Sequence, residues 1–236
     1  MPQKLIVAID GPAGSGKSTS AILVAQKLGY LYIDTGAMYR AITYLAIKKN
    51  FNNKEDIIRL TEKTDLKLDF GEGRTKVFAD GKEITEDIRM PEINARVSEI
   101  SKIETVRKIL VQKQREMGSG NRGVVMEGRD IGTVVFPNAD VKIFMTASID
   151  ERAKRRKKEY SEKGINVTLE DVKKNLLSRD EIDSGREVSP LTIADSAVEV
   201  NTSEVSIEEQ VNIILEEIKK AAVKKGISIK VNWKTK

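Results

Sequence analysis

A glycine-rich run near the N-terminus has the residue types and spacing of a phosphate-binding site. Residues Gly11–Ser18 read G-P-A-G-S-G-K-S and match the pattern G-x-x-x-x-G-K-[ST]. Glycines allow backbone N–H groups to turn inward onto phosphate oxygens, and the positive end of a following helix favours the same anion. Lys17 can reach the β- and γ-phosphates, and the Ser18 hydroxyl can ligate Mg²⁺. We therefore predict that a nucleoside triphosphate contacts Gly11, Pro12, Ala13, Gly14, Ser15, Gly16, Lys17, Ser18 and Thr19.

The segments on either side are those that such a loop requires. Residues 4–10 are mostly apolar and predict a buried strand, and residues 19–28 predict a helix. The alternative is an ordinary glycine-rich turn, but every fixed position of the pattern is matched in a strand–loop–helix setting. The loop is therefore the predicted centre of the functional site.

Composition narrows the chemistry that the site can use. The 236 residues contain neither cysteine nor histidine, which excludes disulfides, thiolate metal sites and the usual general base. Catalysis must then rest on lysine, arginine, carboxylates, hydroxyls and a bound hard cation. The net charge of +5 suits anionic partners without separating nucleotides from nucleic acid. Because no apolar run approaches the length of a membrane span and the N-terminus leads straight into the first strand, we expect a cytoplasmic protein.

Three further segments supply arginine and aspartate, each expected near the carboxyl end of a predicted strand. That edge of an open α/β sheet is where ligands bind. A single surface Arg/Asp pair means little, but four such sites at one edge are harder to dismiss. Since the arginine fork matches phosphate oxygens, the set predicts a polyphosphate site beside a second anionic ligand. The segments are Asp34–Arg40, Glu127–Gly132 and Arg179–Arg186.

The elements that must position these residues alternate between strands and helices. This predicts an α/β fold, with a P-loop NTPase-like five-stranded parallel sheet flanked by helices. Over residues 65–89 the pattern changes to period two, which predicts a small inserted antiparallel three-stranded lobe. The predicted core domain comprises 1–64 and 90–224, with a helical lid at 150–168 and a Lys-rich C-terminal tail at 225–236.

Two strongly cationic stretches allow more than one interpretation. The run 152–158 reads R-A-K-R-R-K-K in a predicted helix, and it is either a solvated surface helix or a flap that closes its arginines over phosphates. The tail, 225–236, is either disordered or packed at an edge, and the sequence assigns no role to it.

The motifs together resemble the bacterial cytidylate kinases of the nucleoside monophosphate kinase family. The resemblance runs from about Lys4 to Ala222 and includes the three-stranded insertion. One departure is Glu127, where the family often has aspartate, and the carboxylate is preserved. The motifs that carry the resemblance are I-D-G-P-A-G-S-G-K-S-T (9–19), D-T-G-A-M-Y-R (34–40), E-G-R-D-I-G-T-V-V-F-P (127–137) and R-D-E-I-D-S-G-R (179–186).

For the phosphates, the resemblance implies roles at several positions. Arg40, Arg129 and Arg186 would hold the acceptor phosphate and the transferring group. Thr35 would line the acceptor site close to that phosphate. The predicted catalytic set adds to these arginines Lys17 of the phosphate loop and two residues of the cationic run, so that it comprises Lys17, Arg40, Arg129, Arg155, Arg156 and Arg186, with Ser18 of the loop as the metal ligand. The resemblance also places the inserted lobe, 65–89, on the acceptor side.

For the nucleoside, the resemblance implies a separate group of residues. Arg179 and Asp183 would hold the sugar hydroxyls. Ser98, Arg107 and Asp130 would read the cytosine edge. The alternative for Ser98 and Arg107 is a solvent-facing place on a helix, which is the default for polar residues there.

The resemblance implies a kinase that transfers the γ-phosphoryl group of ATP to CMP or dCMP with Mg²⁺, giving ADP and CDP or dCDP. We expect a monomer that binds these small molecules, with no membrane partner. One alternative is a related P-loop kinase acting on UMP or shikimate, and the insertion with Asp34–Arg40 argues against shikimate. Another is a P-loop ATPase that binds nucleic acid through its basic segments, with strongly salt-dependent binding.

Overall fold

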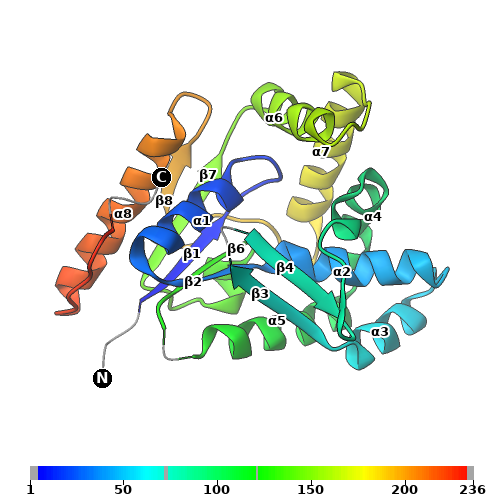
Figure 1. Cartoon of the computed structure of the whole chain (residues 1–236), viewed down its shortest axis with the longest axis horizontal. Helices are drawn as coiled ribbons and strands as arrows, with labels where there is room; N and C mark the ends of the chain where they lie inside the picture. Colours follow the sequence, from blue (N-terminus) through cyan, green and yellow to red (C-terminus); the bar gives the residue numbers. More distant parts are fainter. Residues whose placement is uncertain (1–4, 72–73, 121, 233–236) are drawn as a thin grey trace.

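The computed structural model describes residues 5–71, 74–120 and 122–232. Its centre is a five-stranded parallel sheet with strand order β2-β6-β1-β7-β8, as predicted for an α/β fold (Figure 1). The strands are β1 (Ile6–Asp10), β2 (Leu31–Asp34), β6 (Val124–Gly128), β7 (Val141–Thr146) and β8 (Val198–Asn201). The first strand is apolar up to its last residue because it is buried on both faces.

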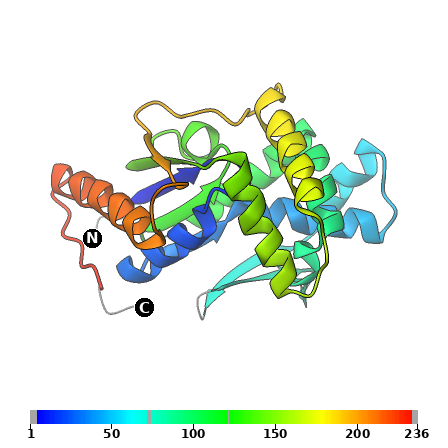
Figure 2. The same ribbon diagram turned by 90° about the horizontal axis from the view of Figure 1, so that it is seen from above.

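Helices cover both faces of this sheet, with α1 (Lys17–Leu28) and α8 (Ile207–Lys224) on one face and α5 (Glu104–Gly118) on the other. The helix α2 (Thr35–Lys48) follows β2 directly, and α3 (Lys54–Lys63) and α4 (Pro91–Ser101) pack on α2 and α5. Val7 and Ile9 share a core with α1 and α8, whereas Ala8 between them packs with Val111 of α5. In both views α8 and α3 lie at opposite ends of the molecule (Figures 1 and 2). Among the helices in the described ranges, none has the length and apolar character needed to cross a membrane.

The inserted lobe is a three-stranded antiparallel sheet, as the period-two pattern predicted. It consists of β3 (Leu66–Gly71), β4 (Arg74–Ala79) and β5 (Lys82–Glu83). Leu66 and Val77 turn inward and join the core that α2 and α4 form, while Lys67 and Asp69 face solvent. The strands therefore lie against the helices that follow β2. The division of the chain into separate domains stays a prediction.

Two helices pack against each other above the phosphate-binding loop, namely α6 (Ile149–Glu162) and α7 (Leu169–Gly185) (Figure 1). The lid predicted at 150–168 corresponds to α6 and the loop that follows it, whereas the helix α7 was not predicted. The expectation that Arg179–Arg186 follows a strand is wrong, because this segment forms the C-terminal end of α7 and the residue after it. The buried positions 172, 176, 179 and 183 repeat with helical spacing, a signal that charged side chains within the repeat obscured.

Two buried aspartates fix the local structure at the carboxyl edge of the sheet. The helix α2 begins at Thr35, because the Asp34 carboxylate accepts a hydrogen bond from Ala37 N (3.0 Å) and caps the helix. After β6 the chain forms a short π-helical turn, Ile131–Val135, that periodicity did not predict. Both oxygens of the buried Asp10 hold this turn, accepting from Ile131 N (2.9 Å) and Gly132 N (2.7 Å).

The described part of the C-terminal tail packs against the core, which answers the choice between disorder and edge packing for residues 225–232. Ile227, Ile229 and Val231 are half-buried against the core that α1 and α8 share. Asn232 N donates to Lys27 O (2.7 Å) at the end of α1. Trp233 and the rest of the tail lie outside the described residues.

Removing the tail after Gly226 should destabilise the fold. Three half-buried aliphatic side chains contribute about 2–3 kcal/mol in total. A loss of that size lowers the melting temperature of a chain of this length by roughly 5–10 °C. Differential scanning calorimetry of the truncated and full chains measures the shift. A truncation after Asn232, which keeps the packed residues, is the control and should melt with the full chain; equal melting of all three would show that the packing contributes nothing.

Asp10→Asn should also destabilise the fold, because an amide offers one acceptor oxygen where two backbone N–H donors need one each. Leaving a buried donor unsatisfied costs about 1–3 kcal/mol. Urea denaturation followed by circular dichroism gives the free energy of unfolding. The exposed Asp195→Asn removes one carboxylate elsewhere and should leave that free energy unchanged; if both variants behaved alike, Asp10 would not anchor the turn.

Candidate active site

The phosphate-binding loop connects β1 to α1 at the carboxyl edge of the sheet, as predicted. Gly11 has φ 146°, and a Cβ there would lie 2.0 Å from Met145 O, so no other residue fits. Gly16 has φ 91° and caps α1. Thr202, just after β8, donates from Oγ1 to Ser15 O (2.9 Å) and ties the loop to the sheet. The loop is thus held in a shape in which the first N–H groups of α1 have no helical partner.

Lys17 lies folded back on its own loop. Its Nζ donates to Pro12 O (2.7 Å) and approaches Ser15 Oγ (3.4 Å). Burial and the charge of the Arg129 guanidinium together lower the pKa of Lys17 to about 7, although the Glu127 carboxylate acts in the opposite direction. Because an anion raises the pKa of a nearby ammonium, a bound phosphate would favour the charged form and draw the side chain away from Pro12.

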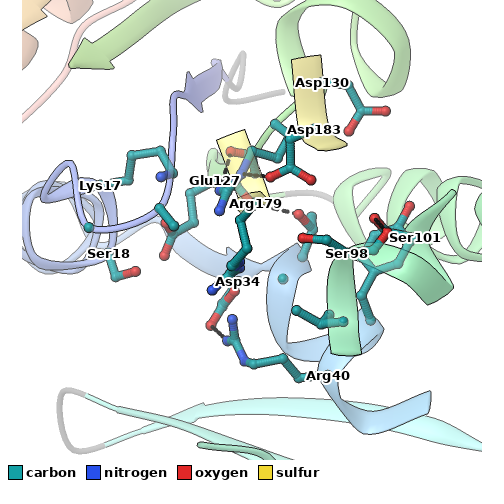
Figure 3. A pocket seen from close by; sticks show the side chains of 18 of the residues that line it. Lys17, Ser18, Asp34, Arg40, Ser98, Ser101, Glu127, Asp130, Arg179 and Asp183 are labelled. Carbon is teal, nitrogen blue, oxygen red and sulfur yellow. Dashed lines mark hydrogen bonds and ion pairs between the residues drawn. The ribbon is translucent and has the colours of Figure 1, made fainter. Parts of the chain in front are cut away.

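All nine residues predicted to bind the acceptor line one cavity of about 110 Å³. Lys17 and Ser18 lie at one side of it, Ser98 and Ser101 at the other, and Glu127 with Arg179 between them (Figure 3). The nine are Thr35, Arg40, Ser98, Arg107, Arg129, Asp130, Arg179, Asp183 and Arg186. The solvent-facing alternative for Ser98 and Arg107 is excluded, since both are buried. The roles of the nine residues remain predictions.

Positive charge exceeds negative charge in this cavity. Seven lysine or arginine side chains and four carboxylates line it, so its lining carries an excess of three cationic side chains. The carboxylates that are paired hold specific arginines: Asp34 bonds Arg40 (2.7 Å), Asp130 bonds Arg107, and Asp183 bonds Arg129 Nε (2.9 Å). The cavity is therefore suited to a ligand that brings negative charge with it.

Arg179 lies buried in the cavity beside other arginines, and this environment lowers its pKa. Burial, together with the charges of Arg129 and Arg156, lowers the pKa of Arg179 to about 9. Its Nε is buried without a hydrogen-bond partner among the described residues. By contrast, although burial raises the pKa of Asp183, the charges of Arg129 and Arg186 hold it below its ordinary value. Asp183 is thus ionised at neutral pH, and Arg179 has an unused donor.

A second cleft, of about 710 Å³, adjoins the cavity along the phosphate-binding loop. A group bound in one pocket would meet a group bound in the other at the six residues that line both, which are Gly14, Lys17, Ser18, Asp34, Arg40 and Arg156. The inserted lobe, α6 and the start of α8 form its other walls. Of the predicted nucleotide contacts, Gly14, Gly16, Lys17, Ser18 and Thr19 line this cleft, Ala13 lines the cavity, and Gly11, Pro12 and Ser15 line neither.

The cationic run on α6 divides into residues with different surroundings. Arg152 is buried and ties the phosphate loop to α7, bonding Ala13 O (3.3 Å) and Asp180 (2.7 Å). Arg155 and Arg156 line the cleft, and Lys157 faces solvent. In this structure Arg155 donates to the Thr202 hydroxyl (2.9 Å) and carbonyl (2.7 Å), and Arg156 pairs with Glu159 (2.9 Å). The run is therefore more than a solvated face, and its function as a closing flap stays a prediction.

Sequence reasoning did not assign a role to three residues that the site contains. Asp34 and Glu127 lie opposite each other in the β2–β6 register and both line the cavity. Burial raises the pKa of Glu127, and the charge of Asp34 raises it further. Tyr39 stacks its ring near Arg107, 5.3 Å from the guanidinium carbon, and burial raises its pKa to about 12. Asp34 and Glu127 could have been identified from the sequence, because each is a carboxylate at the end of a predicted strand.

Comparison with known proteins places this geometry in a family. The family model described as cytidylate kinase matches residues 7–220. The cytidylate kinase of Bacillus subtilis is 49% identical over 220 residues, which cover 92% of this chain and 98% of that protein. The cytidylate kinase of Ligilactobacillus salivarius is 50% identical over 217 residues, covering 91% and 96%. An uncharacterized protein from Eubacterium ventriosum has a similar fold (TM-score 0.52, 10% identity, 92% and 99% covered). The chain belongs to the cytidylate kinase family.

Proposed function

We propose that this protein transfers the γ-phosphoryl group of ATP to CMP or dCMP, giving ADP and CDP or dCDP. The observation that carries the proposal is the meeting of a phosphate-loop cleft with a cationic cavity at Lys17, Arg40 and Arg156. ATP in the cleft and a nucleoside monophosphate in the cavity would bring their phosphates together at that point. The names of the relatives support cytidine as the nucleoside. A monomer that acts in the cytoplasm stays our prediction.

This reaction needs no histidine. The attacking atom is an oxygen of the acceptor phosphate, which is already anionic at neutral pH, so positioning and charge neutralisation contribute most of the rate. Arg40, Arg129 and Arg186 would hold the acceptor phosphate in line with the γ-phosphorus. Lys17 would leave Pro12 O and bind the β- and γ-phosphates. The proton balance is simple because no proton leaves the attacking oxygen.

A Mg²⁺ ion fits the residues beside the loop. The Ser18 hydroxyl and the carboxylates of Glu127 and Asp34 are hard oxygen donors that line the cavity beside the loop. Within the described ranges, no group of three or more histidine, cysteine or carboxylate side chains forms a metal cage. Mg²⁺ at phosphotransfer sites takes few protein ligands and completes its shell with phosphate and water. When bound, it would neutralise phosphate charge, with Ser18 as its protein ligand.

The nucleoside would be recognised away from the phosphates. Asp130 and Arg107 form a buried ion pair beside Ser98, which offers an acceptor for the cytosine amino group and donors for its ring nitrogen and carbonyl. Asp183 and Arg179 would bind the sugar hydroxyls. A site that pairs with the cytosine edge disfavours uracil, because its own buried polar groups are then left unpaired.

A coupled assay with CMP, dCMP, UMP, AMP and GMP tests the proposal. We expect CMP and dCMP to be the preferred acceptors, UMP to be used less, and the purines least. The same assay with RNA in place of a monophosphate tests the nucleic-acid alternative, and no RNA-stimulated ATP hydrolysis is expected. Equal use of UMP would refute the base assignment, and RNA-stimulated hydrolysis without CMP turnover would refute the proposed function.

Arg156→Gln should lower kcat about tenfold or more and change the KM for CMP little. The reason is that a closing cation acts on the charge that develops during transfer. Steady-state kinetics with varied CMP and ATP separates the two constants. Lys157→Gln is the matched control, since it removes the same charge from the exposed next position of α6. An equal loss of kcat in both variants would show that net charge, and not the position in the cleft, is responsible.

Asp183→Asn should raise the KM for CMP and dCMP and leave that for ATP nearly unchanged. A lost hydrogen bond to a charged group weakens affinity by roughly ten- to a hundredfold. Asparagine keeps the size of the side chain next to Arg129, which an alanine would leave unpaired in the cavity. Glu181→Gln, on the exposed side of the same helix, is the control. A defect confined to ATP would contradict the sugar role.

A further inference from the structure

One buried carboxylate of the site is held by a tyrosine hydroxyl rather than by an arginine. Asp34 is paired with Arg40, but Glu127, directly opposite it in the sheet, accepts a hydrogen bond from the Tyr32 hydroxyl and lines the same cavity as Ser18. Glu127 and Tyr32 are both almost completely buried. The position of the Glu127 carboxylate therefore depends on a tyrosine that none of the sequence motifs includes.

The ring of that tyrosine is in turn fixed by the inserted lobe. Phe70 of β3 meets the Tyr32 ring edge-on, with 5.1 Å between ring centroids and 63° between planes. Such pairs favour one geometry over others. A chain of contacts thus runs from the lobe through Phe70 and Tyr32 to Glu127, and from there to Ser18 at the phosphate loop.

We infer that Tyr32 is a positioning residue, whose hydroxyl keeps the Glu127 carboxylate beside Ser18 and Lys17 so that the loop can hold a metal–nucleotide complex. The inference rests on the proposed function and deepens it, because it links the inserted lobe, which forms a wall of the nucleotide cleft, to the carboxylate beside the metal site. Without the Tyr32 hydroxyl, the Glu127 carboxylate loses this hydrogen bond and is free to rotate. Loss of the hydroxyl should therefore weaken binding of the metal–nucleotide complex and leave binding of the acceptor unchanged.

Tyr32→Phe tests this while keeping the ring against Phe70. We expect kcat to fall about tenfold, with the KM for CMP unchanged, since a hydrogen bond to a charged group is worth at least that factor. Calorimetric titration with ADP should show affinity lowered severalfold in the presence of Mg²⁺ and unchanged in EDTA. Tyr44→Phe, which removes the hydroxyl of a half-buried tyrosine on α2 outside both pockets, is the control and should match the wild type in every measurement.

Two more variants decide whether Tyr32 acts through Glu127. If it does, Tyr32→Phe combined with Glu127→Gln should be no worse than Glu127→Gln alone. Phe70→Leu, which keeps the hydroxyl but loosens the ring, should reproduce part of the Tyr32→Phe effect and provides a second route should the latter fold poorly. The inference would be overturned if Tyr32→Phe and Phe70→Leu both had the kcat and the Mg²⁺–ADP affinity of the wild type. It would also be overturned if the effects of Tyr32→Phe and Glu127→Gln were fully additive in the double variant.

The binding titration also keeps the two proposals apart. If the wild type failed to phosphorylate CMP, the proposed function would fall. The role of Tyr32 would still be supported by a loss of Mg²⁺-dependent ADP affinity in Tyr32→Phe and overturned by unchanged affinity.

Discussion

Uncompensated positive charge at the carboxyl edge of the sheet is the constraint on which this structure depends. Seven cations share a cavity with four carboxylates, and burial pushes the pKa of Lys17 and Arg179 well below the ordinary values. Such an arrangement is unfavourable when empty and becomes favourable when phosphates enter. The fold tolerates it because the arginines come from separate elements whose apolar cores are elsewhere. Binding of two anionic substrates would reduce the repulsion between these cations and bring the reacting groups of the substrates together.

Different carboxylates near the site stabilise different parts of it. Asp10 accepts hydrogen bonds from two backbone N–H groups and so fixes the turn after β6. Asp34 both caps α2 and orients Arg40, so one side chain sets the direction of a helix and of a catalytic candidate. Although burial raises its pKa, the charges of Arg40 and Arg89 keep Asp34 ionised. These side chains give the cavity its shape before any ligand is present.

Much of this could be predicted from the sequence where the signal is local. The phosphate loop, the parallel sheet and the three-stranded insertion follow from short patterns, and the loop's Lys17 and Ser18 follow with them. The end of α7 could not be predicted in the same way, because its buried stripe includes Arg179 and Asp183, which read as surface residues until they face a cavity. Ser98 and Arg107 were identified by family resemblance alone, since helical spacing does not say which face is buried. The link from Phe70 to Glu127 spans distant segments, and no local pattern contains it.

Transfer of label from ATP tests the central claim most directly. The wild-type protein is incubated with CMP, Mg²⁺ and ATP labelled at the γ-phosphate, and the products are separated. The two adjoining pockets predict that the label appears in the β-phosphate of CDP, one for each ADP formed, with little inorganic phosphate. Label found in inorganic phosphate, with CMP unchanged, would mean that the cationic cavity does not hold the acceptor and would contradict the account.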